Sequence, residues 1–322
     1  MKIVLFALCV LLAAPGQALP QSAADYPAKP VLLVIVYAAG GGLDVVGRLV
    51  ADRLTRNLGR PVVVENRPGA GGNIGTASVA RSAPDGYTLM ETTNSHNINQ
   101  FIYRNPGYDA KKDFAPVVQL TEAPSVLITH PRSPWRSLKD LVNAARAEPG
   151  KIVYGSAGNG SPTNIAAEMF KTAAGIDLTH LPYKSAAQAF QDVMGAQTPL
   201  AMSALPSVIT HIQSGLLRAL AVTSEKRWPT LPDVPSIAES GYAGFAHMTW
   251  IGILVPAGTP PAVIAKLNRE IAAVLSTPEM RERITAIGAE PVGRSAAEFD
   301  AMLNAEYEVT GTLAARIGLK VD

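Results

Sequence analysis

VLLVIVYAAGGGLDVVGRLVADRL, residues 31–54, joins an apolar run to a helical pattern through three consecutive glycines. The apolar run predicts a buried strand, and the helical spacing of the apolar residues within 43–57 predicts a helix. Glycines let the backbone approach closely and take positive φ angles, so the N–H groups of Gly40–Gly42 can converge on one oxygen atom. A helix N-terminus adds a partial positive charge. The junction therefore predicts an anion site in which Asp44 caps the backbone, and a tight turn without a ligand is the alternative.

Two phosphate-binding motifs can be tested against this junction. A dinucleotide fingerprint, G-x-G-x-x-G, would need its third glycine where Val45 stands. A P-loop, G-x-x-x-x-G-K-[ST], fits the spacing of Gly42 and Gly47 but would need lysine and a hydroxyl residue in place of Arg48 and Leu49. Both motifs fail, so the sequence argues against nucleotide hydrolysis.

Length and composition indicate a globular protein of more than one domain. The 322 residues suffice for two domains with buried cores. Hydrophobic residues make up 48% of the chain and charged residues 17%, which is a globular balance. The net charge of +2, without a run rich in lysine and arginine, argues against a nucleic-acid partner.

The N-terminus has the pattern of a secretory signal peptide. Lys2 provides the positive start, residues 3–14 the apolar segment, and Gly16–Ala18 the small residues for cleavage. We expect residues 1–18 to be removed and the mature protein to be soluble and exported. The single cysteine, Cys9, lies inside this leader in a context that does not fit a lipoprotein signal. The mature chain would then contain no disulfide and no thiol chemistry.

Strand-like and helix-like patterns alternate along most of the chain, which predicts an α/β fold with largely parallel sheets. The number of elements exceeds what one sheet holds, so we expect two lobes, each a mostly parallel sheet flanked by helices. Residues 123–131 and 247–256 are the candidates for two strands that cross between the lobes. The predicted division assigns 26–125 plus 248–322 to the first lobe and 126–247 to the second.

Three further junctions resemble the first, at 62–77, 90–99 and 154–164. The second and third of these carry short hydrogen-bonding side chains: Thr92, Thr93, Asn94, Ser95, Ser156, Asn159, Ser161, Thr163 and Asn164. Ligands of open α/β sheets bind at the carboxyl ends of strands, so four such junctions together favour one ligand cleft. Each junction taken alone is equally well explained by turn and capping chemistry.

One motif raises an enzymatic alternative. The sequence YGSAG around Ser156 approaches the nucleophile elbow G-x-S-x-G, except that Tyr154 stands where the first glycine belongs. An exported serine hydrolase that uses Ser156 is therefore the alternative to a binding protein. The five histidines are scattered and no clustered ligand spacing occurs, so we predict neither a metal nor another cofactor.

Several stretches together resemble the periplasmic receptors of tripartite tricarboxylate transporters, also known as the Bug family. The resemblance runs from about Tyr26 to the C-terminus, and its most specific motifs, in order, are ENRPGAGG (65–72), LRALAVT (217–223) and PDVP (232–235). It implies a two-lobed, type II periplasmic-binding fold that closes on a small di-, tri- or aromatic carboxylate without catalysis. It also implies delivery of that solute to the membrane subunits of a transporter; delivery to a sensor protein is a further alternative. A monomer is the default expectation for such a shuttle.

The resemblance also implies a set of site residues, with the ligand carboxylate against the glycine loop. Carried onto this sequence, these residues are Gly40, Gly41, Gly42, Asp44, Thr93, Asn94, Ser156, Ser161, Thr163, Tyr183 and Lys184. Asn159 joins them from the fourth junction. We expect Tyr37, Tyr183 and Trp250 to form walls that fit the body of the solute.

Three positions depart from the family pattern. Ala38–Ala39 replace a proline pair before the glycines, Ser185 replaces a glycine, and Ser203 stands where the family strand often ends in Asp. An acidic residue at position 203 could face a ligand ammonium group. Ser203 therefore favours a carboxylate without an amine.

Overall fold

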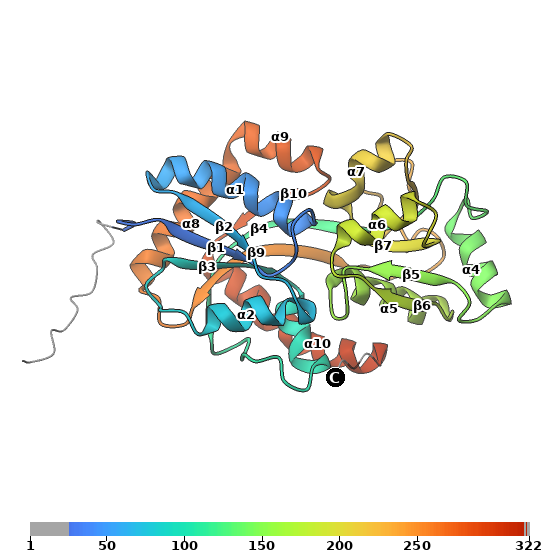
Figure 1. Ribbon diagram of the computed structural model, residues 1–322, viewed down its shortest axis with the longest axis horizontal. Helices are drawn as coiled ribbons and strands as arrows, with labels where there is room; N and C mark the ends of the chain where they lie inside the picture. The colour runs from blue at the N-terminus through green and yellow to red at the C-terminus, as the bar shows by residue number, and fades with distance from the viewer. Residues whose placement is uncertain (1–25, 319, 321–322) are drawn as a thin grey trace, which may run out of the picture.

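The computed structural model describes residues 26–318 and 320, and the predicted signal peptide, 1–18, lies outside the described residues. Figure 1 shows two groups of elements side by side along the long axis of the molecule. The first group combines the blue N-terminal elements with the orange and red C-terminal ones, and the second consists of green and yellow elements. The middle of the chain thus folds as one lobe, and the two ends share the other.

The first lobe contains a sheet of six strands flanked by helices. β1 lies between β2 and β3 and pairs in parallel with both. Beyond β3 follow β9, the first part of β4 and then β10, and each pairs antiparallel with the strand before it. These strands are β1 (Val31–Ile35), β2 (Val62–Asn66), β3 (Thr88–Thr93), β4 (Phe114–Thr129), β9 (Met248–Pro256) and β10 (Glu290–Arg294). The helices are α1 (Gly42–Leu58), α2 (Asn73–Ala80) with the short η1 (Ala70–Gly72) before it, α3 (Ser95–Ile102), α8 (Pro261–Ser276), α9 (Pro278–Ala286) and α10 (Ala296–Ile317).

The second lobe repeats this plan on a smaller scale. Its parallel part has the order β7–β5–β6, and the last part of β4 pairs antiparallel with both β7 and β8. The strands are β5 (Val153–Ser156), β6 (Thr179–Pro182), β7 (Leu200–Ala204) and β8 (Arg218–Val222). The helices are α4 (Leu138–Ala147), α5 (Pro162–Ala174), α6 (Ala186–Met194) and α7 (Leu205–Gln213).

The chain crosses between the lobes twice, as predicted. β4 pairs with β9 up to Pro124 and with β7 from Ser125 onward, so one continuous strand belongs to both sheets. The chain returns at His247, whose N–H donates to Thr223 O at 2.8 Å, and enters β9 at Met248.

The expectation of mostly parallel sheets needs a correction. Parallel pairing is limited to β1 with its two neighbours and β5 with its two neighbours. The crossing strands run antiparallel to the strands beside them, so each sheet is mixed. The reason is that a strand–helix–strand unit returns the chain in the same direction, whereas β4 leaves one lobe and β9 comes back.

Each lobe has its own apolar core. The first contains Ile35, Leu54, Leu267 and Phe299 in one cluster. The second lobe has a cluster on each face of its sheet, because successive side chains of β4 point to opposite faces: Leu127 joins one cluster, and Val126 and Ile128 the other. A smaller cluster of α3, α5 and α10 residues, including Ile165 and Ala314, connects the lobes.

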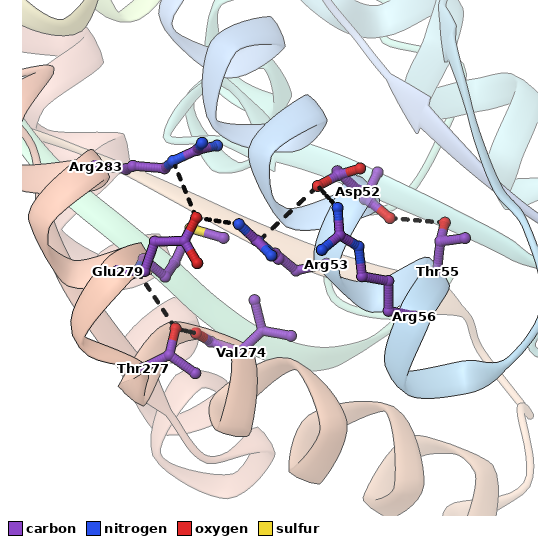
Figure 2. Close-up of polar contacts among 10 residues, drawn as sticks. Asp52, Arg53, Thr55, Arg56, Val274, Thr277, Glu279 and Arg283 are labelled. Atoms are coloured by element: carbon purple, nitrogen blue, oxygen red, sulfur yellow. Dashed lines mark hydrogen bonds and ion pairs between the residues drawn. The ribbon is translucent and has the colours of Figure 1, made fainter.

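An ion pair links α1, the helix that follows the glycine loop, to α9. Figure 2 shows Arg53 of α1 paired with Glu279, which also lies 3.5 Å from Arg283 Nε. On α1 itself, Asp52 lies 3.4 Å from Arg56 Nη2 and 3.9 Å from Arg53 Nε. The C-terminal half of α1 is thereby tied to the body of the first lobe, while its N-terminus faces the second. Within the described chain, no helix is long and apolar enough to cross a membrane.

Candidate ligand-binding cleft

Asp44 holds the glycine loop in place. Its Oδ2 accepts the Gly40 N–H at 3.0 Å, and its Oδ1 accepts from Arg48 Nε at 2.9 Å and Asn66 Nδ2 at 3.0 Å. Burial acts to raise the pKa of Asp44, but the hydrogen bonds from Arg48, Gly40 and Asn66 outweigh it and hold the pKa below its usual range. Gly40 has a φ of +82°, a conformation that glycine adopts without strain. Asp44 is thus a charged cap of the loop, as the sequence predicts, and its oxygens are already occupied.

An inner cavity of about 50 Å³ lies where the two lobes meet. Four helices begin at this cavity, and residues at or near their N-termini line it: Gly41, Gly42 and Leu43 of α1, Pro162 and Thr163 of α5, Ser185 and Ala186 of α6, and Ala204 of α7. None of the described residues that line it carries a formal charge. Helix N-termini carry partial positive charge, so the cavity favours an anion without using a lysine or arginine.

Two of these helices have no side-chain cap. The N-caps of α1 and α7 are Gly41 and Ala204, and neither has a side chain that accepts a backbone hydrogen bond. At α5 and α6, in contrast, the hydroxyls of Ser161 and Ser185 accept from Asn164 N and Gln188 N. The first N–H groups of a helix have no intrahelical acceptor, so α1 and α7 present donors that a ligand oxygen can satisfy.

Unpartnered hydroxyls add a second, independent indication of a ligand. Thr249 of β9 lines the inner cavity, is 6% exposed, and its Oγ1 has no hydrogen-bond partner in the described chain. Ser207 Oγ is also buried without a partner in the described chain; Ser207 does not line the cavity, but its Oγ lies 3.6 Å from the position that a Cβ at Gly42, a lining residue, would take. Buried polar groups in proteins almost always have a partner. These hydroxyls therefore indicate that a polar ligand or water completes the site.

An outer cavity of about 550 Å³ adjoins the inner one, since Tyr37 and Ala157 line both. Its walls come from the glycine-rich loop before α2, from Tyr103 and from residues 157–159 and 183–184. Tyr37 Oη donates to Gly71 O at 2.9 Å, which leaves its ring as an apolar wall between the two cavities. Lys184 is the one formally charged residue among the described residues that line either cavity.

Two glycines allow the lobes to touch at the outer cavity. Tyr103 Oη of the first lobe donates to Asn159 O of the second at 3.1 Å. A Cβ added at Gly71 would lie 2.6 Å from that same Asn159 oxygen, and one at Gly160 would lie 2.7 Å from Asn99 Oδ1. Both glycines have positive φ, +64° and +71°. Side chains at these positions would keep the lobes apart, so the cleft is seen with its walls in contact.

Ser156 and His180 also lie in contact, with 2.7 Å between Ser156 Oγ and His180 Nε2. Asn164 Oδ1 accepts the Gly160 N–H, so Asn164 Nδ2 is the atom that faces Tyr154 Oη at 2.9 Å and His180 Nδ1 at 3.5 Å. This network assigns the tautomer: Nδ1 accepts, and Nε2 carries the proton that it donates to Ser156. Burial lowers the pKa of His180 to about 4, which makes the ring a weak base.

The predicted site residues divide into two groups. Those that line a cavity are Tyr37, Gly41, Gly42, Asn159, Thr163, Tyr183 and Lys184. Those that line neither are Gly40, Asp44, Thr93, Asn94, Ser156, Ser161, Ser203 and the expected wall residue Trp250.

Residues of the second group have their polar atoms engaged elsewhere. Asn94 donates to Glu306 Oε1 at 2.7 Å and accepts the Trp250 N–H at 3.2 Å, and Thr93 Oγ1 donates to Asn94 Oδ1. Trp250 Nε1 in turn donates to Glu306 at 2.9 Å. Ser203 is the exception, because its Oγ is buried without a partner in the described chain.

Sequence reasoning missed several residues of the cleft. Thr249 is one of them: on β9 the sequence points to the neighbouring Trp250 instead, and the structure places Thr249 at the cavity. Tyr103 follows a helix, α3, that the sequence did not predict. Ser185 and Ala204 are the N-caps of α6 and α7. Their position directly before a helix is the sequence signal that could have identified them as cleft residues.

The two lobes, the double crossing and the cleft between them define a type II solute-binding protein. The family model described as "Tripartite tricarboxylate transporter family receptor" matches residues 46–319, and the chain belongs to this family of periplasmic solute receptors.

Relatives of known sequence or structure extend over almost the whole chain. BugT of Bordetella pertussis is 37% identical over 285 residues, which cover 88% of this chain and 87% of BugT. A R. palustris protein solved with adipate has 35% identity and a TM-score of 0.89, covering 92% of this chain and 99% of that one. MatC from Rhodopseudomonas palustris, solved with bound malate, has 28% identity and a TM-score of 0.85, with coverages of 89% and 99%.

Proposed function

We propose that this protein captures a small carboxylate in the cleft between its lobes and delivers it, chemically unchanged, to the membrane subunits of a tripartite tricarboxylate-type transporter. One observation carries the proposal: four helix N-termini open on a single cavity without a formal charge. The adipate and malate in two related structures are consistent with it. Removal of residues 1–18 on export would place the mature chain in the periplasm.

The energies of such contacts are large enough for useful ligand affinity. A hydrogen bond to a charged group contributes roughly 1.5–3 kcal/mol, and a helix N-terminus about 0.3–1 kcal/mol. Four or five such contacts offset the cost of ordering a ligand and leave about −8 kcal/mol, which corresponds to micromolar binding. No ion pair is needed at this end of the ligand.

The residues that we assign to the ligand are those that line the cavities, with Asp44 as the charged cap that positions the loop. Ser203 adds a detail about the ligand. Its hydroxyl is buried without a partner in the described chain and lines neither cavity, so what bears on the ligand is the absence of the acidic side chain that the family strand often carries at this position. We therefore propose an acid without an amine. The lobes are proposed as 26–125 plus 248–322 and 126–247, with the hinge at the two crossings.

The test is binding by the mature chain, residues 19–322, measured by thermal shift and calorimetry against di-, tri- and aromatic carboxylates. In the variant Gly41→Val we expect the affinity for the best acid to fall at least tenfold. Gly41 has φ −87° and ψ 173°, a conformation that any residue adopts, so the fold should survive while the new methyls fill the cavity.

Gly195→Val is the matched control. Gly195 is exposed at the C-terminal end of α6 and has a φ of −79°. A Cβ added there would lie 3.5 Å from Gln191 O, which is an ordinary contact. The control should bind like the native chain. If Gly41→Val binds the acid as tightly as the control, the glycine loop is not the site.

The Ser156–His180 contact is the observation that favours a serine hydrolase, and its chemistry argues against one. A general base must accept the serine proton, whereas here His180 donates to Ser156. Ser156 Oγ also accepts the Gly158 N–H at 3.1 Å and is fully buried. We infer that Ser156 shapes the loop before α5. An active-site serine label should leave Ser156 unmodified, and stoichiometric labelling would favour the enzyme instead.

Delivery to a transporter needs its own experiment. Uptake of the labelled acid should be measured in vesicles that contain the membrane subunits, with and without the mature receptor. We expect uptake only when the receptor is present. Uptake that is independent of the receptor would favour a partner of another kind, such as a sensor protein.

A further inference from the structure

A hollow of about 550 Å³ lies on the surface of the first lobe, between α2 and the segment that follows α3. Ile74 and Arg81 line it from α2 and its C-terminal end, and residues 103–106 line it from the other side. We call it the arginine hollow, since both Arg81 and Arg104 line it. All the described residues around it come from the first lobe, so it is distinct from the inner cavity between the lobes.

The charge of the arginine hollow is not neutralised within the described chain. Arg81 and Arg104 are exposed, and neither guanidinium group has a hydrogen-bond or ion-pair partner among the described residues. None of the described residues that line the hollow is acidic. Arginine presents its N–H donors in a planar fork that matches a carboxylate. The hollow therefore suits a partner with acidic side chains.

The other side chains of the hollow are those of a protein interface. Ile74 is 59% exposed, and Gly69 makes room for it, because a Cβ at Gly69 would lie 2.5 Å from Ile74 Cδ1. A single exposed apolar residue is ordinary. Here it lies beside Tyr103 and two arginines, and tyrosine and arginine are the types that often dominate binding at protein interfaces.

The arginine hollow adjoins the ligand cleft. Ala70 and Tyr103 line both the hollow and the outer cavity. Tyr103 is also the residue that donates to Asn159 O of the second lobe. A partner in the hollow would therefore contact residues of the closed cleft and lie beside the cavity from which a solute leaves.

We propose that the arginine hollow is the surface by which this receptor docks to its transporter, and that it takes a segment of a membrane subunit with acidic side chains next to an apolar one. The inference rests on the proposed function, since it requires delivery to membrane subunits. A lipid surface fits less well, because electrostatic attachment to membranes uses clusters of about four to eight lysines and arginines. Opposite charges also speed association, which suits a shuttle.

The experiment measures uptake in proteoliposomes that contain the membrane subunits, at increasing concentrations of mature receptor loaded with the labelled acid that binds best in calorimetry. The test variant is Arg81→Gln/Arg104→Gln. The control, Arg132→Gln/Arg136→Gln, removes two exposed arginines before α4, which Figure 1 shows at the end of the second lobe away from the first.

We expect the half-saturating receptor concentration to rise at least tenfold in the test variant and to stay native in the control. Acid affinity and melting temperature should be native in both, because the replaced side chains are exposed and line neither ligand cavity. High salt should raise the value of the native receptor and change that of the test variant little.

A photo-crosslinking amino acid at position 74 tests the chemistry of the partner. We expect a light-dependent product with a membrane subunit, mapped by mass spectrometry to a segment that contains Asp or Glu. The same group at Leu216, which is 56% exposed on the second lobe, is the control and should give no such product. A crosslink to a segment without acidic residues overturns the proposed chemistry.

The remaining outcomes separate this inference from the proposed function. Native uptake with the test variant, or equal losses in test variant and control, overturns the docking surface and leaves the carboxylate receptor standing. Binding to phosphatidylglycerol vesicles, or self-association of the native chain, that is lost only in the test variant would assign the hollow to a lipid surface or to a second copy instead. If the native receptor supports no uptake, the proposed delivery fails, and this surface with it.

Discussion

Glu91 on β3 is fully buried, and neither of its carboxylate oxygens has a hydrogen-bond partner in the described chain. It lies against α1 one turn below the glycine loop, where a Cβ at Gly47 would collide with its Oε2. Burial, followed by the nearby Asp44 carboxylate, raises the pKa of Glu91 well above its usual range. The folded protein therefore keeps the Glu91 proton at pH values where the unfolded chain has lost it.

Glu91→Gln is expected to stabilise the fold at neutral and alkaline pH. An unfolded glutamate ionises at about pH 4.3, and above that pH the folded state binds the extra proton, so native stability falls as pH rises. The slope is at most about 1.4 kcal/mol per pH unit for one proton, until the folded-state pKa is reached. Glutamine removes this cost, so the stability gained by Glu91→Gln should increase from pH 5 to pH 8.

Urea unfolding at several pH values measures this effect, and Glu225→Gln, which removes an exposed carboxylate, is the control. A gain that stays constant across pH would mean that Glu91 is ionised in the folded state.

At the scale of the elements, α3 shows where local patterns fall short. Ser95–Ile102 is rich in asparagine and serine, which favour turns over helices when nothing else intervenes. In the fold, Asn97 donates to Leu303 O at 3.0 Å and to Glu306 Oε2 at 2.8 Å, both on α10. Contacts made by residues more than 200 positions away therefore stabilise a helix that its own sequence does not favour.

The ion pair between Arg53 of α1 and Glu279 of α9 in Figure 2 should contribute little to stability. Glu279 is about half exposed, and exposed pairs typically contribute about 0.2–1 kcal/mol, less at high salt. We expect Glu279→Gln to lower the free energy of unfolding by no more than about 1 kcal/mol at low salt, with a smaller change in 1 M NaCl. Ligand affinity should not change, since the pair lies at the opposite end of α1 from the cleft. A tenfold loss of affinity would show that α9 positions the glycine loop.

At the scale of the whole molecule, closure of the cleft depends on the contact between residues 158–160 and α3. Gly160→Ala should hinder this closure, because the new Cβ would lie 2.7 Å from Asn99 Oδ1 and 2.8 Å from Ile102 Cδ1. We expect the native protein to become more compact in X-ray scattering on saturation with ligand, and Gly160→Ala to lose this compaction and to bind at least tenfold more weakly.

Gly175→Ala separates closure from backbone strain. Gly175, at the end of α5, has a φ of +59°, so alanine is strained there as it is at Gly160, but no atom lies within 4 Å of its Cβ. This control should lose stability and keep both affinity and compaction. Equal affinities for the two variants would mean that the contact at Gly160 does not hold the lobes together.

The sequence by itself determined the class of fold and predicted the type of site. Alternating strands and helices with glycine between them require α/β layers, and a strand that ends in glycines before a helix places free N–H groups at one edge of a sheet. These are local properties, fixed by apolar spacing and by the backbone freedom of glycine at positions such as Gly40. The resemblance of whole motifs then gave the receptor family, which the family model and the relatives confirm.

Only the tertiary structure decided which polar groups remain for a ligand. Asn94 and Thr249 look equally available in sequence, yet Glu306 and Trp250 engage the first, whereas the second lies unpartnered in the cavity. Ser156 likewise meets His180, a partner that no local motif predicts. The physical reason is that each polar group can make only a limited number of hydrogen bonds. Whether a side chain makes them within the protein or leaves them for a solute depends on residues that arrive from elsewhere in the chain.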